Sequence, residues 1–319
     1  MKDEPTKQML EFTLETTDLP GLPVAHRGKV RDVYDLGDRL LLVTSDRISA
    51  FDVVLGTIPC KGQVLNTIAA HWFGKTASVV QNHVISVPDP CAMVVKKLKP
   101  LQVEVVVRRH LTGSLFREYE KGHRDLYGLG LPAGLRRDQR FDQPLLTPTT
   151  KAAVGQHDQP LSAAEVVEQG LVSAPLWKQV SEAAFSLFRC GEEEARKQGL
   201  ILVDTKYEFG LEGARLLVMD EIHTPDSSRY WELDSYEKLY EQGKSQRMLN
   251  KENIRQWLLE RGFDGHGPAP ALTEEVRLSL AQTYLDLQER LTGTRSELPR
   301  EAPQQRLLSN LRKCGILSW

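Results

Sequence analysis

The sequence predicts an α+β protein in which a strand-rich first third precedes a larger part that mixes helices with strands. Short β-rich runs dominate the chain up to His110, and from Pro175 onward a long amphipathic helix leads directly into a β-hairpin. Runs of strands and helices that follow one another in this way are typical of α+β folds. We therefore expect two lobes, residues 1–110 and residues 111–319, with ample length to bury a hydrophobic core.

Charge and cysteine content narrow the class of protein. The 41 Lys and Arg nearly balance the 43 Asp and Glu, to a formal net charge of -2, and neither sign forms a long block. This balance argues against nucleic acid or a membrane as the main partner and favours small-molecule ligands. The cysteines form no CxxC pair, no apolar run approaches the ~20 residues of a membrane span, and the charged start is unlike a signal peptide. We expect a cytoplasmic protein with free thiols, and the sequence indicates no particular oligomeric state.

The first lobe is expected to be mainly a sheet. VRDVYD and RLLLVTS flank the turn Leu36–Asp38, which predicts a β-hairpin over Arg31–Ser45. The apolar pattern of Leu65–Phe73 predicts a helix. Two strand-like runs, Met93–Lys97 and Val103–Val107, are separated by a Lys-Pro pair that ends the first of them.

The second lobe is expected to begin with an irregular stretch. Glycine and proline punctuate Gly122–Pro160, which predicts a long functional loop or a domain connection. In Pro175–Gln198 apolar residues recur at helical spacing and a glycine follows, so this is the clearest helix. The next residues read as two strands around a turn at Glu212–Gly213. Two further amphipathic helices are expected at Asn253–Arg261 and Thr273–Leu291.

Charged residues concentrate on one strand of the predicted second hairpin. Alternation places Asp204, Lys206 and Glu208 on the same face. If the turn has an even register, Asp220 on the returning strand joins them and makes three carboxylates around one lysine. Hard oxygen ligands of this kind suit Mg²⁺ together with substrate phosphates. The alternative is the solvated outer face of an antiparallel sheet.

The segment after this hairpin favours a binding site over a solvated face. In TPDSSRYW, the residues Asp226, Ser228 and Arg229 place hydrogen-bonding groups beside a proline turn. An arginine grips a carboxylate or a phosphate through two parallel hydrogen bonds. The hairpin and this segment together therefore predict a site for anions and a metal ion.

Three segments nearer the N-terminus carry weaker signals. In HRGKVRDVYD, Gly28 lets backbone N–H groups approach a phosphate and Lys29 adds charge, but the pattern is neither a Walker loop nor GxGxxG and also fits a solvated basic turn. SDRISAFD crowds polar groups after an apolar strand, and RRHLTGS offers a guanidinium, hydroxyls and backbone amides to an anion. Both are also compatible with ordinary turn chemistry. HExxH and GxSxG are absent, so nothing supports a metalloprotease or a serine hydrolase.

The sequence resembles the SAICAR synthetase family over Val24–Gly293, because six segments follow one another in that family's order: HRGKVRDVYD, TSDRISAFD, EVVVRRHLTGS, TPTTKAAVGQHD, LILVDTKYEFG and MDEIHTPDSSRYW. The resemblance implies a two-lobed α+β fold with ATP in a cleft between a strand-rich N-terminal lobe and a larger C-terminal lobe. It implies a ligase of purine biosynthesis that joins aspartate to 5-amino-1-(5-phosphoribosyl)imidazole-4-carboxylate and releases the succinocarboxamide (SAICAR), ADP and phosphate.

The resemblance also implies roles for individual residues. ATP is implied to contact a phosphate loop at Gly28, Lys29 and Arg31, an adenine-side segment at Val95, Lys96 and Leu98, and Lys151. Magnesium is implied to bind Glu208 and Asp220, with a further ion at Asp158. The ribonucleotide is implied to contact Glu104, Arg108, Ser114, Asp204, Lys206 and Arg229, with Asp226 and Ser228 nearby, while the substrate loop matches Asp46, Arg47 and Ser49.

The implied reaction needs an activated carboxylate. Because a carboxylate is a poor acylating agent, ATP is expected to convert it into an acyl phosphate that the amine of aspartate attacks. Catalysis is expected to involve Asp204, Lys29 to offset charge, and Lys206 with Arg229 to hold two anions together. A small-molecule kinase with the same ATP cleft and a non-enzymatic nucleotide-binding protein are the alternatives. Amide formation that depends on aspartate distinguishes the ligase from both.

Overall fold

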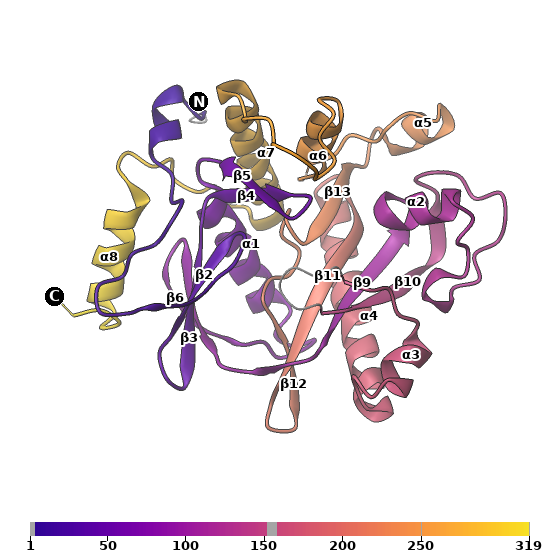
Figure 1. The fold of residues 1–319 in the computed structure, drawn as a ribbon, viewed down its shortest axis with the longest axis horizontal. Coiled ribbons are helices and arrows are strands. Elements are labelled where there is room, and N and C mark those ends of the chain that lie inside the picture. The colour runs from indigo at the N-terminus through magenta and orange to yellow at the C-terminus, as the bar shows by residue number, and fades with distance from the viewer. Residues whose placement is uncertain (1–3, 152–157, 250, 319) are drawn as a thin grey trace.

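The computed structural model describes residues 4–151, 158–249 and 251–318. It holds antiparallel sheets with helices packed against them, which confirms the predicted α+β class. The first sheet, drawn in indigo and purple in Figure 1, has the strand order β1-β2-β3-β7-β6. Its strands are β1 (Val24–Arg27), β2 (Arg31–Asp35), β3 (Arg39–Thr44), β6 (Val84–Asp89) and β7 (Ala92–Lys96).

Both faces of the first sheet are covered, which explains why β3 is apolar at most positions. Leu41 and Val43 are fully buried in a cluster with residues of α8 (Pro303–Lys313). This helix lies beside the first sheet at the outer edge of the molecule in Figure 1. Leu42 packs instead into the core that contains α1 (Lys61–Lys75). A strand that is covered on both faces reads as a continuous apolar run.

The second sheet is built around β11, a 13-residue strand that pairs on both sides. The first half of β11 pairs with β9 and β13, and its second half pairs with β12 and β8. The far edge of the sheet is β10, which pairs with β9. These strands are β8 (Lys99–Pro100), β9 (Val103–His110), β10 (Arg140–Thr150), β11 (Leu200–Glu212), β12 (Arg215–Met219) and β13 (Ser228–Glu232).

One hydrophobic core joins the two sheets. The helix α4 (Ala174–Lys197) packs its apolar stripe, which includes Val180 and Leu187, against β11, as the helical spacing predicts. The helix α7 (Glu274–Thr292) packs against α1, and α1 contacts the first sheet. Buried residues of α1, α4, α7, β9 and β11 belong to the same cluster. The two sheets therefore share a core.

The remaining elements are short. The strands β4 and β5 pair only with each other and form a separate hairpin. Capping by Ser162 fixes the start of α3, since its side chain accepts a hydrogen bond from the N–H of Glu165. These elements are η1 (Lys7–Glu11), β4 (Arg47–Ala50), β5 (Val53–Thr57), α2 (Gly113–Glu120), η2 (Leu126–Gly128), α3 (Ala163–Glu168), α5 (Tyr236–Glu241) and α6 (Glu252–Leu259).

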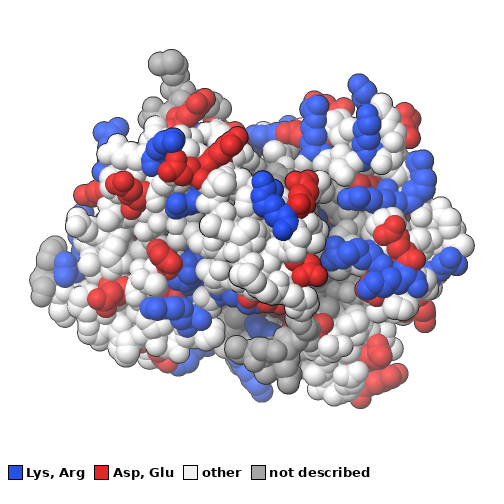
Figure 2. Space-filling model, turned by 45° about the horizontal axis from the view of Figure 1, so that its top comes forward, with Lys and Arg blue, Asp and Glu red and all other residues white. Residues whose placement is uncertain are grey.

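The surface carries charges of both signs and an open groove. Acidic and basic side chains are interspersed over the face shown in Figure 2. Within the described ranges, no helix is long and apolar enough to cross a membrane.

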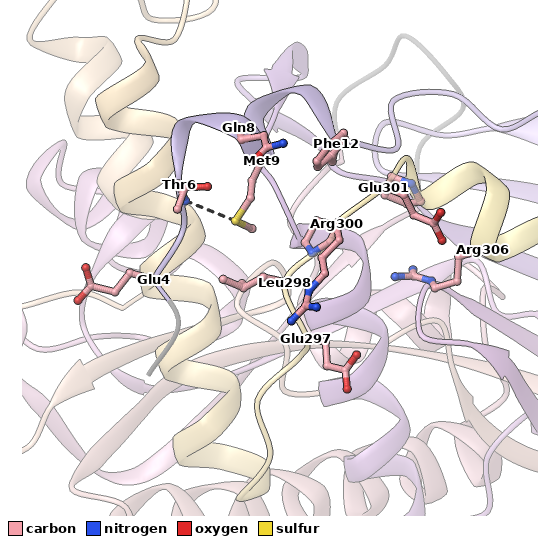
Figure 3. Close-up of a pocket in the computed structure, with 12 residues that line it drawn as sticks. Glu4, Thr6, Gln8, Met9, Phe12, Glu297, Leu298, Arg300, Glu301 and Arg306 are labelled. Atoms are coloured by element: carbon pink, nitrogen blue, oxygen red, sulfur yellow. Dashed lines mark hydrogen bonds between the residues drawn. The ribbon is translucent and has the colours of Figure 1, made fainter. Parts of the chain in front are cut away.

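The N-terminal segment with Thr6 and Met9 and the later segment with Leu298 and Arg300 line a groove of about 1340 Å³ (Figure 3). None of the residues predicted for the functional site lines it.

Most predicted elements are confirmed, and one prediction is wrong in part. The hairpin over Arg31–Ser45 is β2 and β3, and the predicted helices are α1, α4, α6 and α7. The stretch Gly122–Pro160, predicted to be irregular, contains the 11-residue strand β10. Pro144 and Pro148 lie within this strand, and proline is tolerated there because β10 is at the sheet edge.

The predicted division at residue 110 does not follow the sheets. The strand β9 ends at this residue, yet it pairs with β10 and β11 of the second sheet. The helix α8, from the end of the chain, packs against the first sheet. A strand pattern identifies buried positions but not the partner strand, so sequence alone groups β9 with its neighbours along the chain. The division into two domains therefore stays a prediction.

Candidate functional site

The middle strand of the second sheet brings two arginines to one carboxylate. Asp204 of β11 lies opposite Arg108 of β9 on one side and opposite Arg229 of β13 on the other. Directly opposed residues share a face, so both guanidinium groups reach the same carboxylate. The Nη1 atoms of Arg108 and Arg229 lie 3.2 Å and 2.7 Å from Asp204 Oδ2. We call Arg108 and Arg229 the arginine pair.

The arginine pair carries more positive charge than the one carboxylate that both guanidinium groups contact, and the buried Asp138, whose pKa burial raises and Arg229 lowers by a smaller amount, lies near it. Two guanidinium groups face the single carboxylate of Asp204. Arg108 also donates to the hydroxyls of Thr147, at 2.9 Å, and Ser114, at 3.4 Å, which are neutral. A nearly buried, partly offset cation is costly unless an anion joins it. Ser114 therefore lies with the arginine pair, as the sequence predicts, in an arrangement suited to a phosphate.

Gly113 makes room for this arrangement. It has a φ of +58°, in the left-handed region that favours glycine. A Cβ atom on this residue would lie 2.3 Å from Nη1 of Arg229, well inside van der Waals contact. The glycine of the LTGS segment therefore lets the Arg229 guanidinium lie directly on the backbone at the start of α2.

Further along β11, Lys206 and Glu208 form ion pairs with Glu104 of β9 and with Lys151, which follows β10. Lys206 Nζ lies 2.7 Å from Glu104 Oε1 and 2.9 Å from Glu208 Oε1, and Lys151 pairs with the other oxygen of Glu208. We call these four residues the lysine–glutamate group. Burial by itself would raise the pKa of Glu208, but the two ammonium groups outweigh it and hold that pKa well below its usual range. Asp158 lies close enough to raise the pKa of Glu104, to which burial contributes most.

The register of the second hairpin differs from the predicted one. Glu208 lies opposite Met219, so by strict alternation Asp220 would face the other way, and the even register was wrong. Asp220 instead follows the end of β12 with a φ of +68°, which breaks the alternation. It pairs with Arg31 of β2, whose Nη2 atom also lies 2.8 Å from Oε1 of Glu221. We call Asp220 and Glu221 the acidic pair.

Arg31, the partner of the acidic pair, and Glu208 both act on His83. His83 has a pKa of about 3, mainly because it is buried. Arg31 contributes a smaller lowering, and Glu208 opposes it with a small raising effect. Within the described ranges, no three His, Cys, Asp or Glu side chains gather as a metal cage. The donor set nevertheless fits Mg²⁺, which usually takes one or two carboxylates and completes its shell with water and phosphates. Two carboxylates against the single guanidinium of Arg31 leave the negative charge that such an ion needs.

The loop of residues 28–31, for which the sequence predicts phosphate binding, is held by hydrogen bonds from Arg47. The N–H of Gly28 donates to the carbonyl of Arg31 at 2.7 Å and closes a tight turn. The buried guanidinium of Arg47 donates to the carbonyls of Gly28 and Lys29, at 3.0 Å and 3.1 Å, and to the carboxylate of Asp32, at 2.7 Å. In this structure the Arg47 side chain is therefore used in hydrogen bonds within the protein, which set the shape of the loop.

Asp46 also contacts the chain. Its carboxylate accepts hydrogen bonds from the N–H groups of Leu14 and Gly62, both at 2.7 Å, and burial raises its pKa to about 6. Lys29, by contrast, is half exposed and pairs with Asp52 of the β4–β5 turn. Of the residues predicted to contact a ligand in this region, Lys29 is thus the one whose side chain is accessible.

The adenine-side segment bridges the two sheets. Val95 is buried in β7, where the segment leaves the first sheet. Lys96 pairs with Glu212 at the end of β11, with 3.0 Å between Nζ and Oε1. A Cβ on Gly210 of β11 would lie 2.9 Å from the Cβ of Leu98. The segment therefore crosses from the first sheet onto the second, beside the hairpin that carries Glu208.

A second buried cluster surrounds Asp226. Its carboxylate lies 2.8 Å from Nζ of Lys61 and 4.0 Å from Nζ of Lys251, and it accepts a 2.7 Å hydrogen bond from the hydroxyl of Tyr284. Lys251 also donates to the hydroxyl of Ser49 at 3.3 Å. We call Lys61 and Lys251 the lysine pair. Of this cluster, the sequence predicted only Asp226 and Ser49, because neither lysine nor the tyrosine belongs to a recognisable motif.

Ser228 lies apart from the charged face. It pairs with Thr205, the residue between Asp204 and Lys206, and donates to the hydroxyl of Thr205 at 2.7 Å. Alternation turns these two hydroxyls to the opposite face of the sheet. The hydroxyl of Ser228 thus lies on the opposite face of the sheet from the arginine pair.

Comparisons with known proteins agree with one another. The SAICAR synthetase family model matches residues 24–269. A phosphoribosylaminoimidazole-succinocarboxamide synthase from Cytophaga hutchinsonii is 46% identical over 300 residues, which cover 93% of this chain and 96% of that protein. The structure of SAICAR synthase from Saccharomyces cerevisiae complexed with SAICAR is 32% identical with a TM-score of 0.78, and covers 89% of this chain and 99% of that one.

A more distant structure extends the likeness in fold. A SAICAR synthetase (Type-2) in complex with ADP is 23% identical, has a TM-score of 0.66, and covers 86% of this chain and 99% of that one. The family model matches well over half of this chain, and the Cytophaga protein aligns along nearly its whole length. The chain therefore belongs to the SAICAR synthetase family, the ligases of purine biosynthesis.

Proposed function

We propose that this chain uses ATP to join L-aspartate to 5-amino-1-(5-phosphoribosyl)imidazole-4-carboxylate, and that it releases SAICAR, ADP and phosphate in the cytoplasm. One observation carries the proposal: the arginine pair and the lysine–glutamate group follow one another along β11, and the acidic pair follows the neighbouring strand β12. They correspond to a phosphate, an activated carboxylate and metal-bound ATP. The Saccharomyces relative complexed with SAICAR supports the same product.

The ribonucleotide matches this order in charge and in length. Asp204 and Glu208 are four residues apart on β11, so their Cα atoms are separated by about 13 Å at ~3.3 Å per residue. We place the 5′-phosphate between the arginine pair and Ser114. The ribose and imidazole then follow β11, so that the 4-carboxylate lies toward Lys206 and Glu208.

ATP is placed between the two sheets. Its phosphates lie at the loop of Gly28, Lys29 and Arg31, and its adenine lies at the segment 95–98. Glu208 and Asp220 would hold Mg²⁺, with Asp158 nearby, and the ion supplies charge neutralisation on the β- and γ-phosphates when bound. A fold neighbour solved in complex with ADP is consistent with a nucleotide in this fold.

The cationic residues then hold three anionic substrates together, ATP, aspartate and the ribonucleotide, and offset the repulsion between them. An oxygen of the 4-carboxylate attacks the γ-phosphorus of ATP, and ADP leaves with the electrons of the broken P–O bond. The amine nitrogen of aspartate attacks the acyl carbon, phosphate leaves, and the nitrogen loses a proton as the amide forms. Lys29 and Lys206 offset charge at the reacting groups, while Arg229, oriented by Asp204, holds the distant phosphate.

The test measures ADP release by the purified chain with ATP and the carboxylated ribonucleotide, with and without aspartate. We expect ADP and the succinocarboxamide to form only when aspartate is present. Equal ADP release without aspartate would identify a kinase. No ADP under either condition would leave a nucleotide-binding protein without this activity.

A further inference from the structure

The lysine pair carries more positive charge than the one carboxylate with which it pairs directly. Two ammonium groups face the single carboxylate of Asp226. The side chain of Lys61 is fully buried, that of Asp226 is 5% exposed and that of Lys251 is 19% exposed. The residues come from α1, from the connection between β12 and β13, and from the segment before α6. This surplus is therefore built by the tertiary fold at a junction of several elements.

Asp226 is already used by its nearer neighbours. One carboxylate oxygen pairs with Lys61 at 2.8 Å, and the other accepts the hydroxyl of Tyr284 at 2.7 Å. Lys251 stands 4.0 Å away and donates to a neutral group, the hydroxyl of Ser49. Burial lowers the pKa of Lys251, Asp226 partly counteracts this effect, and Lys61 adds to it. Lys251 is thus the partly exposed cation that an added anion would stabilise.

The lysine pair adjoins the acidic pair. Glu221 raises the pKa of both Lys251 and Tyr284, so its charge reaches this cluster. The same carboxylate pairs with Arg31 of the phosphate loop at 2.8 Å. The arginine pair is a separate set of residues around Asp204. Through Glu221 the lysine pair is therefore linked to the loop where we place the phosphates of ATP, whereas the arginine pair is not.

We propose that Lys251, supported by Lys61 and by the hydroxyl of Ser49, binds a carboxylate of the amino-acid substrate. This inference rests on the proposed function. An ammonium with a neighbouring hydroxyl can bind a carboxylate, and the arginine pair is already assigned to the phosphate of the ribonucleotide. A dicarboxylic amino acid held by one carboxylate keeps its amine free to approach the acyl phosphate. Lys251 and Ser49 then recognise aspartate, and the arginine pair recognises the ribonucleotide.

The experiment compares Lys251→Met, Lys251→Arg and a control, Lys244→Met, which changes an exposed lysine in the same part of the chain. Aspartate is titrated calorimetrically with the ribonucleotide and a non-hydrolysable ATP analogue present, and KM is measured for each substrate. We expect Lys251→Met to raise the Kd and KM for aspartate by about tenfold or more, which corresponds to at least about 1.4 kcal/mol. Lys251→Arg should recover part of this loss, and the control should bind as the unmodified chain does.

The outcomes separate this inference from the proposed function. Unchanged aspartate binding in a folded Lys251→Met variant, or a rise confined to the ribonucleotide constant, would overturn the subsite. The melting temperature of Lys251→Met controls for folding. It should not fall, because the substitution removes a mostly buried cation whose charge is only partly offset. If the unmodified chain released no aspartate-dependent ADP, the proposed function would fail. The calorimetric titration would still decide the subsite, since loss of aspartate binding in Lys251→Met alone supports it and equal binding overturns it.

Discussion

At the scale of single residues, the site is marked by charges that do not balance. Two cations face one carboxylate at Asp204 and again at Asp226, whereas two carboxylates face one cation at Arg31. Each surplus has the sign opposite to the part of the substrates that we place there. Burial makes such an imbalance costly in the free chain, and a bound partner of opposite charge offsets that cost. Asp32 also pairs with two arginines, Arg27 and Arg47, so the assignment rests on the grouping of these residues around β11 together with their charges.

Gly113 offers a direct test of the arginine pair. We expect Gly113→Ala to push the Arg229 guanidinium off the backbone, because the new Cβ would lie 2.3 Å from its Nη1 atom. The ribonucleotide KM should rise about tenfold, which corresponds to roughly 1.4 kcal/mol. The KM for ATP should change little, since the loop at Gly28 is unaffected. Steady-state kinetics with each substrate varied in turn measures both values.

A matched glycine separates the collision from backbone strain. Gly243 has a φ of +62°, close to the +58° of Gly113, and has no atom within 4 Å of an added Cβ. Gly243→Ala should therefore share the conformational cost of about 1 to 2 kcal/mol for a left-handed residue without any change in KM. If both variants shifted the ribonucleotide KM alike, the contact with Arg229 would not explain the effect.

Residues were predictable where the local pattern carried the information. Alternation correctly places Asp204, Lys206 and Glu208 on one face, because strand geometry depends only on neighbours in the chain. Lys61 and Lys251 were not predicted. Each is a lone lysine in its own segment, and their pairing with Asp226 arises only when α1 and the segment before α6 are folded together.

At the scale of elements, the predicted phosphate loop is held in place by hydrogen bonds from Arg47. Arg47 of β4 fixes two loop carbonyls and the carboxylate of Asp32 at once, which needs the planar fork of a guanidinium. We expect Arg47→Lys to keep the charge opposite Asp32 but to release the carbonyls of Gly28 and Lys29. The KM for ATP should then rise by about tenfold, more than that for aspartate or the ribonucleotide.

Arg306 of α8, a partly buried arginine that pairs with β6 of the first sheet, provides the control. Arg306 pairs with Asp89 at 3.2 Å and does not contact the loop. Arg306→Lys should lower the melting temperature to a similar extent while the KM for ATP stays the same. Thermal denaturation and kinetics are measured on both variants. Equal KM values for ATP in the two would mean that Arg47 stabilises the fold without shaping the phosphate site.

Elements were predicted well by periodicity and poorly where an edge or a chain reversal decided the outcome. The stripe of α4 and the first hairpin follow directly from apolar spacing. The strand β10 was missed because Pro144 and Pro148 argue against a central strand, although they are compatible with an edge. The position of Asp220 depends on one residue with positive φ after β12, which no alternation rule describes.

At the scale of the whole molecule, three histidines are buried in the interior of the described structure. His83, His110 and His223 are at most 1% exposed, and burial lowers the pKa of each to about 3. His110 packs against the rings of Trp231 and Tyr236, with centroids 5.0 Å and 5.3 Å away. These side chains are therefore neutral in the folded chain at pH values where an unfolded histidine becomes protonated.

We expect this difference to make the fold sensitive to mild acid. Because the folded pKa of each histidine lies below the unfolded value near 6.5, stability is complete above that value and is lost as the pH falls toward 3. Each group contributes about 1.4 kcal/mol per pH unit within this range. Asp46 acts in the opposite direction, since its pKa is raised to about 6. The free energy of unfolding should therefore fall by about 3 kcal/mol per unit between pH 6 and pH 5.

Urea denaturation at pH 7, 6, 5.5 and 5 measures this slope, and one substitution assigns it. His110→Leu removes one buried titrating ring at nearly constant volume, so the slope should decrease by about 1.4 kcal/mol per pH unit, even if the variant is less stable at pH 7. The same change at the exposed His266 should leave the slope as it is. A slope that His110→Leu does not alter would mean that the acid sensitivity comes from the ion pairs around β11 and not from the buried histidines.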